Sequence, residues 1–255
     1  MNRAVVSVAT GSSYVRGQDR LRAAVLELDP GAAVCMWRNR LPKGCPSHEV
    51  VPYAMKAFAM REAMEKGHEL LLWCDASVVP IKPLEALWAR IERDGYWMSR
   101  NGFTNYEWTA DSAYESLFRN HFGPNYKPSI EAMRATNKKI EHVVATAFGL
   151  NVGSNKGRAF LEEYFWLGSE TKAFCGPWMN AGHPDNAGKI ADGKRIARCG
   201  AGDVRGHRHD QTAASVLAWR LGFRLTNPPE IFSYGKLGDK HDPRTALLAD
   251  GSVLA

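Results

Sequence analysis

Three kinds of segment that would point directly to a class of protein are absent from this sequence. No stretch approaches the roughly 18 consecutive apolar residues that a membrane-spanning helix needs. The first ten residues hold one arginine and a short apolar run, and no signal-cleavage pattern follows them. Lysines and arginines are spread along the chain without a basic run. We therefore expect a cytoplasmic protein without a membrane span.

Cysteine is scarce and irregularly placed. The 255 residues include five cysteines, and no two of them have the C-x-x-C spacing. An odd number of scattered cysteines argues against both a disulfide framework and a zinc ribbon. We expect reduced thiols, several of them in the core.

Several short catalytic and nucleotide-binding motifs are also missing. The sequence contains neither G-x-G-x-x-G nor the P-loop pattern, which disfavours NAD binding and Walker-type ATP chemistry. It contains neither G-x-S-x-G nor H-E-x-x-H, which disfavours a serine-hydrolase elbow and a zinc protease.

The composition that remains is that of a soluble globular protein with a positive charge. Hydrophobic residues make up 45% of the chain, and 255 residues fit one large domain or two small ones. The net charge of +6 suits an anionic ligand, such as a nucleotide or a nucleic acid. The charge does not choose between these two.

The N-terminal half alternates predicted strands and helices. The predicted strands are residues 4–9, 33–37, 69–74 and 96–99, and the predicted helices are 15–28, 50–66 and 84–91. The order βαβαβαβ favours an α/β fold with a mostly parallel central sheet flanked by helices.

The second half is less regular. Residues 101–127 form an aromatic-rich insertion that we expect to face a substrate, and residues 176–206 contain seven glycines, as a mobile loop or lid would. Further predicted elements are helices at 129–137, 157–167 and 209–221 and strands at 143–152 and 223–226. A single domain is the simplest organisation.

The apolar run that ends at Asp75 is the first candidate site. Asp75 and Ser77 follow a predicted strand, and ligands of open α/β sheets bind outside the carboxyl ends of the strands. Their oxygens suit a hard divalent cation that holds a diphosphate. The alternative is an aspartate that caps the following turn. Lys56, on the preceding predicted helix, is expected to be an ordinary surface charge.

The second candidate is the segment 206–212, GHRHDQT, at the start of a predicted helix. Asp210 is a candidate catalytic or acceptor-binding carboxylate, and the alternative is a helix N-cap. His207 and His209 have a spacing that also suits a metal, but no further ligand is evident nearby.

The third candidate is the turn after the first strand. Thr10, Gly11 and Tyr14 lie where backbone amides and hydroxyls can hold part of a nucleotide. The alternative is a plain tight turn.

With these residues in place, the chain resembles glycosyltransferases of the GT-A (Rossmann-like) superfamily, and in particular bacterial and phage members. The segments that carry the resemblance are VVSVATGSSY, PYAMKAFAMREAMEKGHELLLWCDAS and GHRHDQTAASVLAWRLG. The middle segment looks like the Asp-x-Asp region, with Asp75 in the first position and Ser77 in place of the second aspartate. AFGLNVGSNKG, residues 147–157, is similar to the strand and turn that line the acceptor pocket.

The resemblance implies transfer of a sugar from a nucleotide sugar, expected to be UDP-linked, to an acceptor hydroxyl. It implies a nucleotide-sugar-binding half at about 1–100, an acceptor-binding half at about 101–235 and a C-terminal tail at 236–255. Asp75 would bind Mn²⁺ or Mg²⁺, and Asp210 would act on the acceptor. The implied donor-binding residues are Thr10, Gly11, Tyr14, Asp75 and Ser77, and the implied acceptor-binding residues are His209 and Gln211.

Three other functions stay open at this point. One is a nucleotidyltransferase that uses Asp75 and a metal, although the turn after strand one is a poor phosphate loop. Another is a phage-type glycosyltransferase that acts on a modified DNA base, with aromatic residues stacking on it. The third is a nucleotide-sugar-binding protein without catalysis. The acceptor is thus a glycan or modified DNA.

Overall fold

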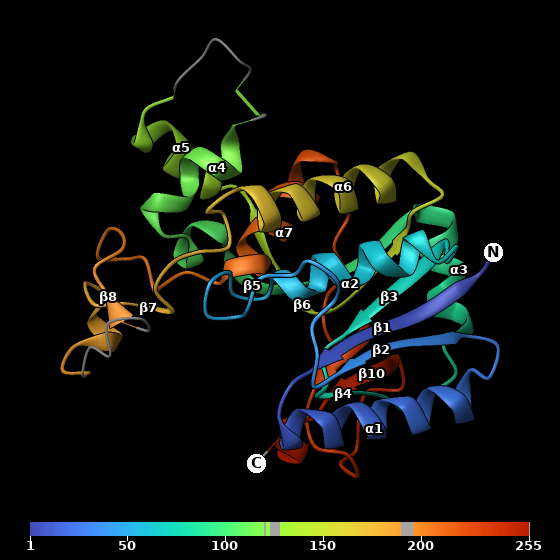
Figure 1. Ribbon diagram of the computed structural model, residues 1–255. Coiled ribbons are helices and arrows are strands. Elements are labelled where there is room, and N and C mark those ends of the chain that lie inside the picture. The colour runs from blue at the N-terminus through green and yellow to red at the C-terminus, as the bar shows by residue number, and fades with distance from the viewer. Residues whose placement is uncertain (120, 123–127, 190–195, 255) are drawn as a thin grey trace.

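A five-stranded sheet forms the centre of the computed structural model, which describes residues 1–119, 121–122, 128–189 and 196–254 (Figure 1). The strand order is β2-β1-β3-β6-β5. The strands are β1 (Arg3–Ala9), β2 (Ala33–Arg38), β3 (Leu70–Cys74), β5 (Tyr96–Thr104) and β6 (Glu141–Asn151). β1 pairs in parallel with β2 and β3, and β6 alone runs antiparallel, between β3 and β5. The predicted mostly parallel α/β sheet is confirmed.

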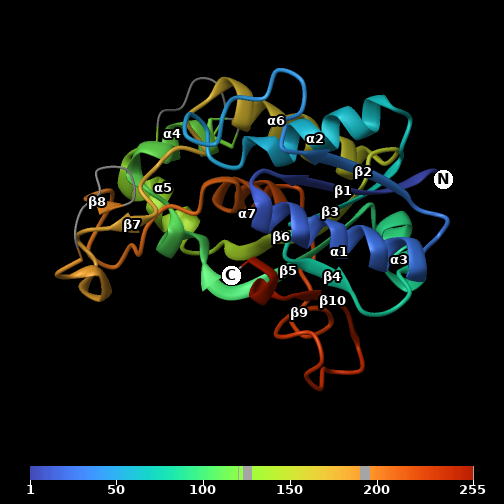
Figure 2. The same ribbon diagram turned by 60° about the horizontal axis from the view of Figure 1, so that its bottom comes forward.

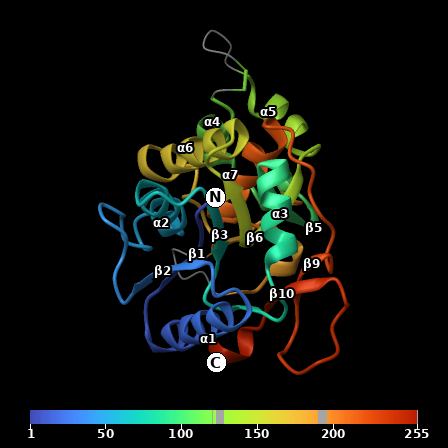
Figure 3. The same ribbon diagram turned by 90° about the vertical axis from the view of Figure 1, so that its right-hand side faces the viewer.

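Helices cover both faces of this sheet (Figure 3). The helices on one face are α2 (Ala54–Glu65), α6 (Asn155–Glu170) and α7 (His209–Arg220), and those on the other are α1 (Ser12–Leu28) and α3 (Glu85–Asp94). In β3, Leu71 and Trp73 face the first group, whereas Leu70, Leu72 and Cys74 face the second. Because both faces are covered, the strand is a continuous apolar run rather than an alternating one.

The C-terminal segment forms part of a second, smaller sheet (Figure 2). Its strands are β4 (Val78–Pro80), β9 (Ile231–Tyr234) and β10 (Thr245–Ala249), with β10 in the middle. β10 is antiparallel to β4 and parallel to β9. Residues 236–255, expected as a tail, therefore supply a central strand. The strand expected at 223–226 is reduced to one bridge, between Ser99 and Thr226.

Short elements follow β5 and precede α7. They are η1 (Asn105–Trp108), η2 (Asp111–Ala113), α4 (Tyr114–Phe118), α5 (Ile130–Asn137), β7 (Met179–Asn180), η3 (Pro184–Asn186) and β8 (Ile196–Ala197). One more short helix, η4 (Gly251–Leu254), follows β10. In the aromatic-rich insertion, Tyr106, Tyr114 and Phe118 are buried, so these rings belong to the core instead of facing a substrate. Residues 120 and 123–127 of the insertion, and 190–195 of the expected lid, lie outside the described residues.

Two expectations from the composition concern membrane spans and cysteines. Within the described ranges, no helix has both the length and the apolar character that crossing a membrane requires. All five cysteines are free, and Cys74 is buried in β3.

Candidate active site

Asp75 stands at the carboxyl end of β3, as the sequence predicts. Its backbone N–H donates to the carbonyl of Thr146 in β6 at 2.9 Å, which fixes the residue between two strands. Its side chain is 31% exposed, although the strand that leads to it is fully buried. The carboxylate therefore reaches the surface at the edge where open α/β sheets bind ligands.

Lys56 of α2 links Asp75 to Asp210. Its Nζ lies 3.1 Å from Asp75 Oδ1 and 3.1 Å from Asp210 Oδ2, and it donates to the carbonyl of Ala145 at 2.8 Å. These contacts use all three donors of the ammonium group. The expectation that Lys56 is a surface charge is wrong, because its side chain is 3% exposed. Lys56 is three residues after Tyr53 and four before Met60, on the helix face that packs against the sheet.

Aromatic side chains enclose this cluster. Lys56 Nζ lies 5.2 Å from the centre of the Tyr53 ring and 5.6 Å from that of Trp73. Trp73 Nε1 donates to Asp75 Oδ1 at 2.8 Å, and the Tyr164 hydroxyl donates to Asp210 Oδ2 at 3.1 Å. A buried charge is tolerated when it is paired and hydrogen-bonded in this way.

The charges of the three groups are coupled. Burial acts to lower the pKa of Lys56, but Asp210 and Asp75 outweigh it and raise that pKa. Burial raises the pKa of Asp75 and of Asp210, and the ammonium of Lys56 opposes the shift. One cation faces two carboxylates, so with both ionised the cluster keeps an excess negative charge. Among the described residues, Asp75 Oδ2 has no partner and is the oxygen left for a ligand.

Asp210 lies in the first turn of α7, and its side chain is 5% exposed. The residue at the N-cap is Arg208, so the alternative of Asp210 as a cap is wrong. Gln211 is half-buried beside it. Asp75, the more exposed of the two carboxylates, is therefore the one that an incoming ligand meets first.

Backbone contacts engage both ring nitrogens of His207 and one ring nitrogen of His209. The Nδ1 atom of His207 accepts from the N–H of Ala110 at 3.2 Å, and its Nε2 lies 2.9 Å from the carbonyl of Ala173. These contacts leave the neutral ring of His207 no lone pair for a metal, which contradicts the His207–His209 metal alternative. His209 Nδ1 lies 2.9 Å from the carbonyl of Phe174, and burial lowers the pKa of His209 to about 4.

Two residues with a left-handed backbone flank the cluster. Tyr53, just before α2, has φ of 61°, and His209, the first residue of α7, has φ of 48°. Their rings lie 5.7 Å apart. Non-glycine residues in this region carry strain, and such strain collects at functional sites. The helices that carry Lys56 and Asp210 thus both begin at a strained residue.

The turn after β1 lies at the same sheet edge as Asp75, because β1 and β3 are parallel neighbours. Thr10 and Gly11 are exposed, and Tyr14 is 52% exposed. Gly11 has φ of 89°, its N–H donates to Asn39 Oδ1 at 3.1 Å, and the space where a side chain would project is open. The geometry leaves room for a ligand beside this turn.

Ser77 is held through its backbone. Its carbonyl accepts from Arg20 Nη2 at 3.0 Å and from the N–H of Asp250 at 2.9 Å, and its side chain is half-buried. Ser77 thus lies beside Asp75 at the carboxyl edge of the sheet. Lys56 and Tyr164, which the sequence does not single out as candidate site residues, also lie in this cluster.

Comparison with known proteins identifies no family model and no curated protein that matches the chain. Among solved structures, the chain is similar to a glycosyltransferase involved in the glycosylation of the major capsid of PBCV-1, with 10% identity and a TM-score of 0.49 over 98% of this chain and 92% of that one. It is also similar to mouse xyloside xylosyltransferase 1 in its apo form, with 9% identity and a TM-score of 0.49 over 100% and 99%.

A third similar structure is the galactosyltransferase LgtC in complex with donor and acceptor sugar analogues, with 13% identity and a TM-score of 0.33 over 89% of this chain and 98% of that one. These three are glycosyltransferases. At such low identity, the likeness gives no residue of this chain a role.

Proposed function

We propose that this protein transfers a sugar from a nucleotide sugar, with UDP as the expected nucleotide, to an acceptor hydroxyl. The observation that carries the proposal is the convergence of Asp75 and Asp210 on the buried Lys56 at the carboxyl edge of the sheet. Burying two carboxylates and one ammonium group costs desolvation free energy, which apolar side chains of similar size would not cost. Such clusters of buried charge beside an open sheet edge are typical of functional sites.

On the donor side, Asp75 presents its free oxygen beside the turn of Thr10, Gly11 and Tyr14. This turn would hold the nucleotide, and Ser77 would lie close to the diphosphate. A cation between the diphosphate and the excess negative charge of the cluster would offset their repulsion.

The site fits Mn²⁺ or Mg²⁺ only together with the donor. Within the described part of the chain, no group of three or more His, Cys, Asp or Glu side chains is placed to hold a metal ion. Magnesium is commonly bound through one or two carboxylates plus substrate phosphates, and the open oxygen of Asp75 meets that need. A bound cation would neutralise charge on the departing diphosphate.

On the acceptor side, Asp210 would act on the attacking hydroxyl. If the reaction inverts the anomeric carbon, Asp210 serves as its base, and if the reaction retains, Asp210 supports the sugar. The raised pKa of Asp210 suits a group that takes up a proton. His209 and Gln211, on either side of it, would contact the acceptor.

A thermal-shift screen of UDP, GDP, CMP and TDP sugars tests the donor site, since a ligand that binds the native state raises its melting temperature. We expect a UDP sugar to give the largest shift and Asp75→Asn to reduce it. Asp94→Asn is the matched control, because its side chain is 34% exposed and it ends α3 at the opposite edge of the sheet. A full shift in Asp75→Asn, or no shift with any nucleotide sugar, contradicts the proposal.

The same screen separates the role of the metal. We expect Mn²⁺ alone to leave the melting temperature nearly unchanged and Mn²⁺ with UDP to raise it more than UDP does alone. An equal effect of UDP with and without Mn²⁺ would remove the metal from the account and leave the donor site standing. Binding without turnover would favour the non-catalytic alternative.

A further inference from the structure

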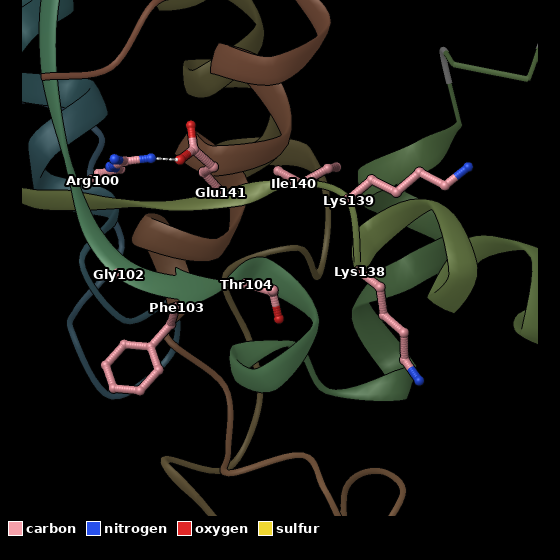
Figure 4. Close-up of a pocket in the computed structure, with 8 residues that line it drawn as sticks. All are labelled: Arg100, Gly102, Phe103, Thr104, Lys138, Lys139, Ile140 and Glu141. Carbon is pink, nitrogen blue, oxygen red and sulfur yellow. Dashed lines mark hydrogen bonds and ion pairs between the residues drawn. The ribbon is translucent and has the colours of Figure 1, made fainter.

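A groove lies between the end of β5 and the start of β6 (Figure 4). The pairing of the two strands shifts there, because Arg100 pairs with Val143 whereas Thr104 pairs with Glu141, so β5 holds two extra residues. Such a bulge bends its strand away from the partner. The space that results has a volume of about 480 Å³, within the range of small-molecule sites. Its lining residues are Arg100, Gly102, Phe103, Thr104, Lys138, Lys139, Ile140 and Glu141.

Positive charge dominates the lining. Three cations, Arg100, Lys138 and Lys139, face one carboxylate, Glu141, with which Arg100 forms an ion pair. Lys138 is 3.9 Å from Asp203 and mostly exposed, and Lys139 has no ion pair among the described residues. Figure 4 shows Lys138 and Lys139 on the opposite rim of the groove from the Arg100–Glu141 pair, with their side chains extending outward in different directions. The ammonium group of Lys139 is therefore unpaired within the described part of the chain, whereas that of Lys138 lies 3.9 Å from Asp203 and 4.4 Å from the centre of the Tyr106 ring and would have to leave these contacts to meet an anion.

One aromatic face completes the groove. Phe103 is 40% exposed, and its neighbour Gly102 has φ of 86° with open space where a side chain would project. An exposed ring beside open backbone suits the apolar face of a sugar. The acidic residues Glu107 and Asp203 beside the groove interrupt the positive surface. A nucleic-acid backbone needs a continuous positive track, so the groove favours a sugar over a nucleic acid.

The groove and the candidate active site lie near the same strand, β6. Glu141, in its lining, is four residues before Ala145, whose carbonyl accepts from Lys56 at 2.8 Å. Four strand residues span about 13 Å. The Phe103 ring also lies 5.7 Å from that of Trp108, whose carbonyl accepts from Thr212 of α7 at 2.6 Å. Because His142, Val143 and Val144 are buried, an acceptor that reaches both places would follow the more exposed side, which carries Phe103 and Trp108.

We propose that this groove binds an anionic sugar unit of the acceptor, one that carries a phosphate, sulfate or carboxylate group. The inference rests on the proposed transfer to an acceptor hydroxyl and adds the chemical class of the acceptor. Lys138 and Lys139 bind the anionic group, and Phe103 packs against the ring of the sugar.

The test is a titration of glucose 6-phosphate, glucose 6-sulfate, glucuronic acid and neutral glucose, followed by NMR. We expect at least one anionic sugar to bind more tightly than glucose, and the strongest of the three identifies the anionic group. The double variant Lys138→Ser, Lys139→Ser should weaken that binding by about tenfold, because it removes two charged donors. Lys240→Ser, an exposed lysine in the β9–β10 connection, is the control and should bind as the wild type does.

Equal binding of glucose and all three anionic sugars, or unchanged binding by the double variant, overturns the inference. Tighter competition for the groove by a short single-stranded DNA also overturns it. Nucleotide-sugar turnover is measured separately on the same samples. A protein that binds the anionic sugar without turnover refutes the proposed function and not the groove, and turnover without sugar binding does the reverse.

Discussion

At the scale of single residues, Lys56 is the centre of the account. Its ammonium is 3% exposed and contacts both Asp75 and Asp210. Removing one partner of a buried ion pair leaves an uncompensated charge, which costs about 3–5 kcal/mol. We therefore predict that Lys56→Met lowers the free energy of unfolding by this amount, as measured by urea denaturation at neutral pH.

The control variant is on the same helix. Lys66 forms an exposed pair with Glu62, four residues away, and such pairs contribute less than about 1 kcal/mol. Lys66→Met should therefore have a small effect. The double variant Lys56→Met, Asp210→Asn should recover part of the stability, since it leaves one buried carboxylate fewer. A loss in Lys56→Met no larger than in Lys66→Met would contradict the network.

The position of Asp75 could be predicted from sequence, but its partner could not. An aspartate that ends an apolar run indicates a strand end, because the pattern is local in the chain. The sequence predicts a surface charge at Lys56, on the exposed side of its helix, and lysine is seldom fully buried without a partner. Its partners are 19 and 154 residues further along the chain. Only the fold brings these residues together. The helical spacing of Tyr53, Lys56 and Met60 is the one local signal that Lys56 lies on the buried face of its helix.

At the scale of elements, Arg20 of α1 connects the second sheet to the turn after β3. Its Nη1 lies 3.0 Å from Asp250 Oδ2, and its Nη2 donates to the carbonyl of Ser77 at 3.0 Å. We predict that Arg20→Met destabilises the protein by about 1–3 kcal/mol, because it removes hydrogen bonds of a charged group. Hydrogen exchange should speed up at the amides of Val78 and Asp250, which the same contacts order.

Arg22 offers the comparison for this experiment, because it is exposed on the same helix. Arg22→Met should change neither the stability nor the exchange of those amides by more than a small amount. Protection of Val78 and Asp250 that survives in Arg20→Met would show that β10 is held by its strand pairing alone.

The longer elements were predicted well and the second sheet was not. The helices at α1, α3 and α7 have apolar spacing and clear ends, such as Gly95 after α3. β4 is three residues long, and its partner β10 begins 165 residues after β4 ends. A strand of three residues is too short to show an alternating apolar pattern. The sequence of residues 236–255 therefore does not indicate that they pair with β4.

At the scale of the whole molecule, buried histidines set the response to acid. Burial lowers the pKa of His142 and of His207 to about 3, and that of His209 to about 4. Below the ordinary value near 6.5, the unfolded chain binds protons that the folded protein does not. The stability that these neutral rings contribute is therefore present above pH 6.5 and is lost as the pH falls toward 4.

We predict a steep fall in the free energy of unfolding between pH 6 and pH 5. Each of these histidines contributes up to about 1.4 kcal/mol per pH unit to the slope. His142→Gln should reduce the slope by the contribution of one histidine, about 1.4 kcal/mol per pH unit. Denaturation at a series of pH values measures this slope. An unchanged slope in a folded His142→Gln variant would mean that His142 carries a proton in the native protein.

The central claim is that Asp75 and Asp210, joined by Lys56, form the site of sugar transfer. The most direct measurement is the hydrolysis or transfer rate with the nucleotide sugar that the thermal-shift screen selects, for the wild type, Asp75→Asn, Asp210→Asn and the control Asp94→Asn. The account predicts a loss of at least about 100-fold in Asp210→Asn, the scale of a proton-transferring group, and a similar loss in Asp75→Asn, the scale of lost charge stabilisation at the leaving group, with a normal rate in the control. Turnover at the wild-type rate in folded Asp75→Asn and Asp210→Asn would contradict it.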